Sequence, residues 1–380
     1  MPYLSFASNY LWVLVIGLLG PSVPAILADL GISYAQAGLF FTLLSLGSLF
    51  GTFLGGLASD TLNRKALFAG IALALAAGLV GAALAPSYGL ILAAVFAFSL
   101  FGSPAGTVGQ SVMLDLFPER RERLLALMTL FGALGSFTAP LLVSANYAAG
   151  LGWRWPFAEV AGMALLLFAA ILFVPLPRAA GRPQGRGALG QVLVHPRVLA
   201  CAVLIFFSVA PDLGFSFWLA EHFRTELKVD LRLASAVVSV YLIGIMAGRL
   251  GTARLLRRLP ARRIVQAGLG LGLASLAAFL AAPWIPVKVL AILAYGLGGA
   301  PVFPMLMASG TSAFPDRPGA VSGVLFASVS LGGMVFPIVL GAVAAAVGIR
   351  LSYLLVGLVL AGLLLAVSLA RRRLFSPEGA

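Results

Sequence analysis

Twelve long apolar runs separated by short polar breaks constrain the fold of this chain more than any other feature. The runs cover approximately residues 8–28, 35–58, 66–85, 89–114, 125–149, 154–175, 199–221, 233–253, 264–282, 287–310, 320–345 and 351–370. A helix needs about 20 consecutive apolar residues to cross the hydrocarbon core of a bilayer. The runs are continuous and do not alternate polar with apolar residues, which excludes a transmembrane β-barrel. Only 10% of the residues are charged, too few to cover a water-facing surface. The sequence therefore predicts an all-α integral membrane protein with twelve transmembrane helices.

A polar stretch near the middle of the chain divides the runs into two groups of six. It covers residues 177–198, is rich in Gly, Pro and Arg, and is typical of a flexible linker. We therefore expect an N-terminal six-helix bundle over 1–176 and a C-terminal one over 199–380. The halves also resemble each other, since Asp115–Arg120 ends the fourth run and the similar Ala313–Arg317 ends the tenth. Two such bundles with pseudo-two-fold symmetry, around a cavity at the membrane midplane, form a known transporter architecture.

The 25 basic and 12 acidic residues give the chain a net charge of +13. The basic residues lie in short clusters between the runs rather than in one stripe, so nucleic acid is not an expected partner. Loops on one predicted side carry 18 of them and loops on the other side carry 6, while Arg249 lies within a run. Because cytoplasmic loops carry the excess of Lys and Arg, both termini are predicted to be cytoplasmic. The preference for Arg over Lys, 22 to 3, and the many Ala residues suggest a bacterial source, and hence a cytoplasmic (inner) membrane.

The loop between the second and third runs carries a distinctive motif. Gly56 is followed four residues later by Asp60, then by a turn and the basic pair Arg64 and Lys65. This motif resembles the signature loop of the major facilitator superfamily, with Asn63 where that family usually has Gly. Asn tolerates the left-handed backbone that Gly would supply, so this departure from the motif is mild. Together with the run count, the linker and the repeat, the resemblance implies the major facilitator fold.

Three further stretches are similar to the fucose/glucose–proton symporter branch of that superfamily. They are Gly102–Pro118, Asp212–Glu221 and Gly296–Pro315. The chain departs from the branch at Gln110, where Asn is expected, and at Asp212, where Glu is expected. A multidrug-antiporter motif in the fifth run is degraded at Ala139–Ser144, which counts against an exporter. The resemblance implies proton-coupled uptake of a sugar.

Asp212 is the most informative polar side chain because it lies deep in the seventh run, beside Pro211. A charge at the centre of a membrane helix costs about 2.5–3.5 kcal/mol on insertion scales, so such acids usually face a cavity and are functional. Burial disfavours the charged form, so we expect Asp212 to couple transport to protons or to bind substrate hydroxyls. The alternative is a structural carboxylate bonded to a neighbouring helix. Glu159 is the second candidate for proton coupling, with a local contact to Arg154 as its alternative role.

Polar and aromatic side chains near the middle of the runs are the candidate substrate contacts. They are Thr107, Gln110, Ser208, Asp212, Phe215, Trp218, Tyr241 and Tyr295. Amide and carboxylate groups bind sugar hydroxyls and an aromatic face packs on the sugar ring, so Gln110, Asp212 and Trp218 form a consistent set. Taken singly, each aromatic residue is more often lipid-facing or part of the packing.

Charged residues at the predicted cytoplasmic helix ends are interpreted as a conformational latch. The members are Asp60, Arg64 and Lys65 after the second run and Asp115 and Arg120 after the fourth. A carboxylate at a helix end can hold a basic partner or a helix N-terminus of the facing bundle in one state only. The alternative is a solvated loop that serves topology alone.

Two other patterns concern packing and the membrane interface. The Gly-x-x-x-Gly motifs at Gly51–Gly55 and Gly244–Gly248 predict close helix packing. Asp29, Glu221 and His222 lie at the ends of runs, and we expect them to be interfacial because the cost of a charge falls there.

Enzyme and metal chemistry are not expected. The two histidines, His195 and His222, are far apart in the sequence and only one cysteine, Cys201, accompanies them, so a zinc cluster is not predicted. The sequence has no P-loop spacing, so ATP-driven pumping is not expected, and no cofactor is predicted. We therefore expect a monomeric secondary active transporter that works by alternating access and takes up a small polar solute with protons. The alternatives are a proton-driven antiporter that exports drug-like or amphipathic compounds and a membrane sensor that does not transport.

Overall fold

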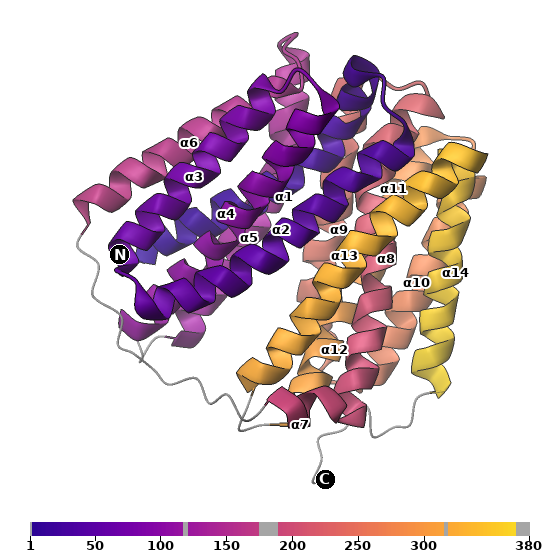
Figure 1. Cartoon of the computed structure of the whole chain (residues 1–380). Coiled ribbons are helices and arrows are strands. Elements are labelled where there is room, and N and C mark those ends of the chain that lie inside the picture. The colour runs from indigo at the N-terminus through magenta and orange to yellow at the C-terminus, as the bar shows by residue number, and fades with distance from the viewer. Residues whose placement is uncertain (1, 117–120, 175–188, 315–317, 370–380) are drawn as a thin grey trace. The chain divides into compact units, whose positions relative to one another are not determined.

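The computed structural model describes residues 2–116, 121–174, 189–314 and 318–369, and the regular structure within these ranges is α-helical. The helices before the central linker are α1 (Pro2–Leu30), α2 (Tyr34–Thr61), α3 (Arg64–Leu84), α4 (Tyr88–Leu116), α5 (Arg121–Ala148) and α6 (Arg154–Phe173) (Figure 1). Those after it are α7 (Leu189–Val194), α8 (Pro196–Thr225), α9 (Leu231–Leu255), α10 (Ala261–Ala281), α11 (Ile285–Gly299), α12 (Val302–Thr311), α13 (Pro318–Val347) and α14 (Ile349–Leu369).

Twelve segments of the described chain are long and apolar enough to cross a membrane, which confirms the predicted number of spans. The tenth segment, Ile285–Thr311, consists of two helices rather than one, because α11 ends at Gly299 and Pro301 is the N-cap of α12. A proline has no backbone N–H to continue the helical hydrogen bonding, so the helix is interrupted there.

The end of the predicted linker is also helical. Residues 189–194 form α7, and α8 begins at Pro196. Helix α8 thus begins two residues before the predicted end of the linker at 198, while the predicted start at 177 lies outside the described residues.

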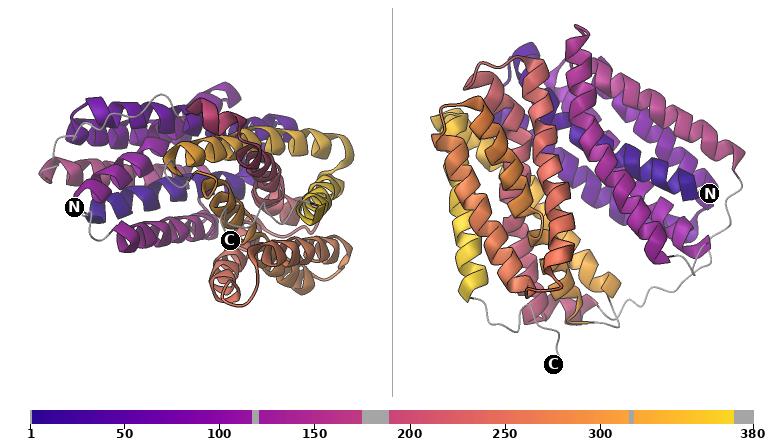
Figure 2. Two further views of the ribbon diagram at one scale, coloured as in Figure 1. Left: turned by 90° about the horizontal axis from the view of Figure 1, so that it is seen from below. Right: turned by 180° about the vertical axis from the view of Figure 1, so that it is seen from behind.

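The chain divides into two compact units. The first comprises Met1–Pro183 with Val229–Ala236, and the second comprises Gln184–Lys228 with Val237–Ala380. In the first unit α1 packs on α5, and α3 packs on both α4 and α6. In the second unit α8 packs on α13, and α10 packs on both α11 and α14 (Figure 2). Each of these pairs has its counterpart in the other unit, so the helix packing repeats as the sequence similarity between the halves predicted.

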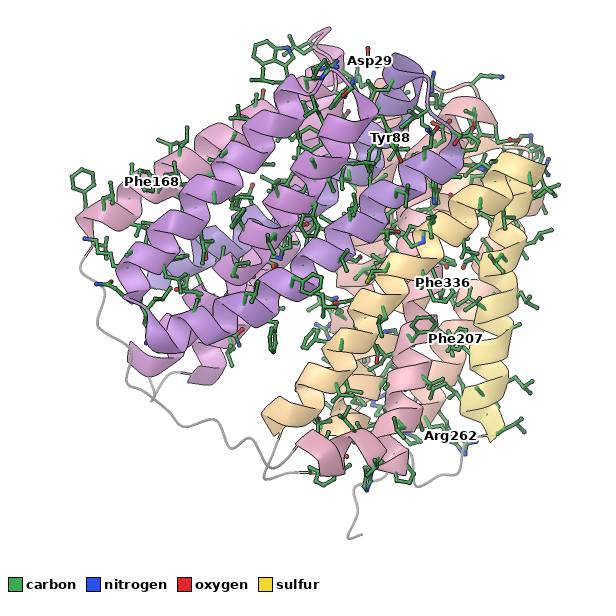
Figure 3. All side chains as sticks on the ribbon, viewed as in Figure 1. Asp29, Tyr88, Phe168, Phe207, Arg262 and Phe336 are labelled. Atoms are coloured by element: carbon green, nitrogen blue, oxygen red, sulfur yellow. The ribbon has the colours of Figure 1, made fainter. Side chains whose placement is uncertain are left out.

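Aromatic side chains fill the contact between α8 and α13 in the second unit. Phe207 of α8 and Phe336 of α13 lie side by side, with their ring centroids 6.0 Å apart (Figure 3). The neighbouring Phe206 ring lies 5.1 Å from that of Phe336. Such packed rings supply much of the contact area between two helices.

Side chains next to the helix starts satisfy backbone N–H groups that have no helical partner. Ser33 and Gln36 form a reciprocal capping box at the start of α2. Asn63 caps α3, where its Oδ1 accepts hydrogen bonds from the N–H groups of Lys65 (3.0 Å) and Ala66 (3.3 Å). The backbone of Asn63 is extended rather than left-handed, with a φ of −62° and a ψ of 113°. The amide oxygen of Asn63 accepts hydrogen bonds from the first turn of α3, and glycine has no side chain that could do so.

The two Gly-x-x-x-Gly motifs lie at close helix contacts, as predicted. A Cβ atom at Gly51 of α2 would overlap the carbonyl oxygen of Leu100 on α4. A Cβ atom at Gly244 of α9 would overlap the carbonyl oxygen of Leu293 on α11. Both glycines let two backbones approach directly, which is the usual packing of small residues in membrane helices.

Replacing Gly51 by alanine is expected to lower the stability of the protein. Overpacking of a tight contact typically costs about 1–3 kcal/mol, because the helices must separate to admit the methyl group. The matched control is Gly70→Ala on α3, where a Cβ atom would meet nothing within 4 Å. There the higher helix propensity of alanine should leave the stability unchanged or raise it. Thermal unfolding of the purified variants in detergent measures the difference, and equal midpoints would contradict the assigned role of Gly51.

Candidate functional site

Asp212 lies near the middle of α8, one residue after Pro211. Its side chain is exposed, whereas Phe215 and Trp218 of the same helix are fully buried. The hydroxyl group of Tyr241, on α9, donates a hydrogen bond to Asp212 Oδ1. Tyr241 is itself only 3% exposed, so packing fixes the position of the donor. The carboxylate is therefore held by a fixed hydroxyl group on one side and accessible on another.

Three buried aromatic residues surround this acid within the second unit. The Phe215 ring centroid lies 4.2 Å from that of Tyr295 and 6.0 Å from that of Tyr241. The Tyr295 hydroxyl donates to the backbone carbonyl of Pro211 at 2.7 Å, directly before Asp212 in the chain. The structure thus brings together four of the predicted site residues. In this arrangement the three rings pack and orient the acid rather than present open faces to a solute.

Arg249, on α9, is the charged residue near this site that the sequence analysis did not select. Its side chain is exposed, and it is close enough for its charge to act on both Asp212 and Tyr241. No ion pair joins Asp212 to a cation among the contacts of the described residues. The guanidinium is therefore a nearby opposite charge rather than a permanent partner. An arginine inside a predicted span was the signal that could have found it, because such charges are rare and usually paired.

Four further residues were predicted as substrate contacts, two in each unit. Ser208, one helical turn before Asp212, donates its hydroxyl to the carbonyl of Ile205 at 2.8 Å. Trp218 is fully buried on α8. Gln110 is half-buried on α4 of the first unit. The side chain of Thr107, also on α4, lies outside the described part of the structure.

Glu159 lies on α6 of the first unit and is half-buried. Asn146 of α5 donates a hydrogen bond to Glu159 Oε2 at 3.1 Å and another to the Leu142 carbonyl at 3.0 Å. The amide donor orients the carboxylate without neutralising its charge. Glu159 is thus a partly accessible acid that is hydrogen-bonded by a neutral group.

The structure does not support the alternative role of Glu159, which was a local contact with Arg154. Arg154 instead forms an ion pair with Asp29 of α1, with 2.7 Å between Nη1 and Oδ2 (Figure 3). Trp153 Nε1 donates to the same carboxylate oxygen at 3.2 Å. Both charged partners are partly exposed, which agrees with the interfacial position expected of Asp29.

Lys65, one of the predicted latch residues, binds within its own unit. Lys65 Nζ, in the first turn of α3, donates to the carbonyl of Leu172 at 2.7 Å, next to the end of α6. Arg262, in the first turn of α10, binds the carbonyls of Val367 and Ser368 at the corresponding end of α14 (Figure 3). A cation at a helix C-terminus satisfies its last carbonyls and opposes the helix dipole. The same kind of contact occurs in both units. We therefore interpret Lys65 as a residue that stabilises the packing of α3 on α6 within one bundle.

Of the remaining latch residues, Arg64 is buried, with 4% of its surface exposed. The side chains of Asp60 and Asp115 and the whole of Arg120 lie outside the described part of the structure. The latch between bundles therefore stays a prediction.

Glu221 and His222, at the end of α8, are buried inside the protein. They are 2% and 1% exposed. The His222 ring packs on Phe279, 4.8 Å between centroids, and on Tyr353, 5.5 Å away. Side chains of α10 and α14 cover this end of α8, which the sequence of α8 alone does not reveal, and the predicted interfacial position of both residues stays a prediction.

Metal-binding side chains do not gather anywhere in the described residues, where no group of three or more His, Cys, Asp or Glu could hold an ion. Cys201 is a buried, reduced thiol. Its Sγ donates to the hydroxyl of Ser309 at 3.7 Å.

Comparison with known proteins gives a consistent family. The family model described as Major Facilitator Superfamily matches residues 6–337 and residues 214–379. An uncharacterised MFS-type transporter of Bacillus subtilis, YfkL, is 27% identical over 331 residues, which cover 84% of this chain and 81% of that protein.

The solved structures that resemble this one are also transporters. A mutant form of the nucleoside transporter NupG superposes with a TM-score of 0.83 at 15% identity, over 96% of this chain and 98% of that one. A D-xylose-proton symporter superposes with a TM-score of 0.77 at 16% identity, over 99% and 97% of the two chains. At such low identity these structures show a shared fold, while the substrates named belong to those proteins.

The hydrogen bond between Tyr241 and Asp212 is expected to give a measurable coupling energy. A hydrogen bond to a charged group contributes about 1.5–3 kcal/mol, so Tyr241→Phe and Asp212→Asn should not be additive when Asp212 is ionised. A double-mutant cycle on the free energy of unfolding measures this term. The control cycle pairs Asp212→Asn with Tyr10→Phe, whose hydroxyl bonds Thr138 in the first unit. The control should be additive to within about 0.5 kcal/mol, and additivity of the Tyr241 cycle would contradict the contact.

Proposed function

The chain belongs to the major facilitator superfamily, and from this premise we propose that it takes up a small polar organic solute, with a sugar as the favoured class, together with protons. It is a multi-pass membrane transporter, and its described residues contain twelve segments long and apolar enough to span a membrane. The proposal concerns the driving ion, the direction of transport and the solute. In its cycle, alternating access would carry the solute across while one acid binds and releases the coupled proton.

The observation that carries the proposal is the setting of Asp212. A carboxylate deep in a membrane-spanning helix is costly, so an acid found there usually serves a function. Tyr241 donates a hydrogen bond to it, and Arg249 is close enough for its charge to act on it. Proton binding would remove the negative charge and so weaken both interactions. The two protonation states of Asp212 then differ in their contacts, which is what coupling to a conformational change requires.

Glu159 is proposed as a second proton site because its described contact, the Asn146 amide, leaves its charge uncompensated. It lies in the first unit and Asp212 in the second, so each bundle contributes one acid. We assign the principal role to Asp212, since it lies nearer the middle of its span.

The solute contacts proposed are polar side chains that are at least partly exposed, together with Thr107, which is proposed from the sequence alone. They are the Asp212 carboxylate and the Gln110 amide, with Thr107 and Ser208 as hydroxyl contacts. Amides and carboxylates suit the closely spaced hydroxyl groups of a sugar. The fold shared with a D-xylose-proton symporter is compatible with this class. We assign Phe215, Trp218, Tyr241 and Tyr295 to holding Asp212 and its helix in place, because they are buried.

The proposed setting is the bacterial cytoplasmic membrane, with both termini in the cytoplasm and the protein as a monomer. This orientation rests on the distribution of basic residues between alternate loops. The latch proposed for the cytoplasmic side consists of Asp60, Arg64, Asp115 and Arg120. Lys65 joins it indirectly, by fixing the start of α3 against α6.

Transport in proteoliposomes tests the role of Asp212. A thermal-shift screen of sugars, organic acids and cationic drugs first identifies a solute that stabilises the purified protein. With that solute, Asp212→Asn should abolish accumulation driven by a pH gradient but retain exchange of labelled for unlabelled solute, because the neutral side chain mimics the protonated state. Glu226→Gln is the matched control, an exposed acid at the end of the same helix. Gradient-driven accumulation that stays intact in Asp212→Asn would refute the coupling role. Drug efflux that is lost when the pH gradient collapses would refute sugar uptake.

Arg249 should be required for the same coupling. Without its charge, the ionised form of Asp212 becomes more costly to reach, and the step that releases the proton slows. We expect Arg249→Gln to reduce gradient-driven accumulation at least about tenfold, since loss of 1.4 kcal/mol corresponds to a factor of about ten. Arg249→Lys should retain part of the accumulation. Arg254→Gln, an exposed position further along α9, should transport as the unmodified protein does. Equal rates for Arg249→Gln and Arg254→Gln would show that Arg249 has no part in coupling.

A further inference from the structure

An open apolar groove runs along the first unit between α3 and α4. Its volume is about 560 Å³, and every residue that lines it is Ala, Gly, Leu, Pro or Phe. Small residues line it, among them Ala77 and Gly81 of α3 and Ala93 and Ala97 of α4. At its floor the two helices touch, since a Cβ atom at Gly78 would lie 2.8 Å from the backbone nitrogen of Phe98. The groove is therefore a fixed feature of the helix pair.

The length of the groove matches one leaflet of a bilayer. Its lining extends along α3 from Ala74 to Ala85 and along α4 from Leu90 to Phe101. About eleven residues of helix rise about 17 Å, whereas the full hydrocarbon core is about 30 Å thick. A transmembrane helix from a second protein would need a contact along the whole core, but an acyl chain occupies half of it. The dimensions therefore favour a lipid chain as the occupant.

A cation marks the end of the groove at the α3–α4 loop. Arg154 Nη2 donates to the carbonyl of Ala85, one of the lining residues, at 3.2 Å. Its Nη1 binds Asp29, and the guanidinium has five N–H donors in all, so further donors are left for a ligand. The side chain of Arg154 is still 37% exposed. The adjacent Trp155 is 53% exposed. Arg and Trp together are typical of the headgroup level of a membrane, and a guanidinium suits a phosphate group well.

We propose that this groove binds one acyl chain of an anionic phospholipid from the leaflet at the α3–α4 loop, with the lipid phosphate at Arg154. The apolar walls would contact the chain, and the remaining donors of Arg154 would bind phosphate oxygens at the mouth. The site depends on the chain spanning a membrane and not on the proposed substrate or coupling ion. A failure of proton coupling would therefore leave it intact.

Filling the groove tests the site. Ala77→Leu combined with Ala93→Leu places two larger side chains into the space of the acyl chain. Ala361→Leu, at an exposed position on α14 of the second unit, makes the same change elsewhere and serves as control. Native mass spectrometry in the presence of phosphatidylglycerol counts the lipids retained by each purified full-length protein. We expect the groove variant to retain one fewer lipid than the unmodified protein and the Ala361→Leu control, with unchanged thermal unfolding in detergent.

Arg154→Gln separates the headgroup from the chain. It should weaken retention of phosphatidylglycerol by about tenfold or more while leaving retention of uncharged diacylglycerol unchanged, because hydrogen bonds to charged groups are the stronger ones. Equal lipid retention by the groove variant and the control would overturn the proposal. A dimer of the unmodified protein that the groove variant converts to a monomer, without loss of lipid, would also overturn it by assigning the groove to a second copy.

Discussion

In hydrocarbon every backbone N–H and carbonyl group must find its partner within the protein, and the rest of this structure depends on that constraint. It makes the twelve spans helical, and it decides what happens where the helices end. Lys65 and Arg262 donate to the last carbonyls of α6 and α14. Lys288 and Arg350 do the same for Phe279 and Leu280 at the end of α10. Several cations that topology places at the membrane surface thus also complete the hydrogen bonding of neighbouring helices.

The same constraint determines which contacts the acid of the candidate site needs. A carboxylate in this environment needs donors and opposite charge, and Asp212 has both in Tyr241 and Arg249. The aromatic packing of Phe215 and Tyr295 supports the donor and the backbone next to the acid, so the proposed proton site lies among packed side chains. Packed surroundings convert a change in protonation into a difference in contacts rather than into a local relaxation. This is the physical reason for assigning coupling to this acid.

Sequence reasoning succeeded where a property belongs to one segment and failed where it depends on a neighbour. The apolar runs, the glycine motifs and the repeat are local patterns, and the structure has all three. Asn63 stands where the motif usually has glycine, and only the structure shows that its side chain caps α3. Arg154 was considered as a partner of Glu159 but binds Asp29, which is distant in sequence. His222 lies at the end of a run, and its own segment does not reveal the rings of α10 and α14 that cover it.

The sequence by itself determined the class of this protein, the number of its spans and its membership of a transporter superfamily. These properties depend on the length of apolar runs and on loop motifs, which consist of consecutive residues. The sequence also singled out Asp212 as an acid to examine, since a charge within an apolar run is visible without a structure. Only the tertiary structure decided which side chains surround that acid and which aromatic residues are packed. It alone paired the cations with helix ends and formed the α3–α4 groove. The rotation of each helix about its axis sets these contacts, and that rotation is fixed by packing between segments far apart in the chain.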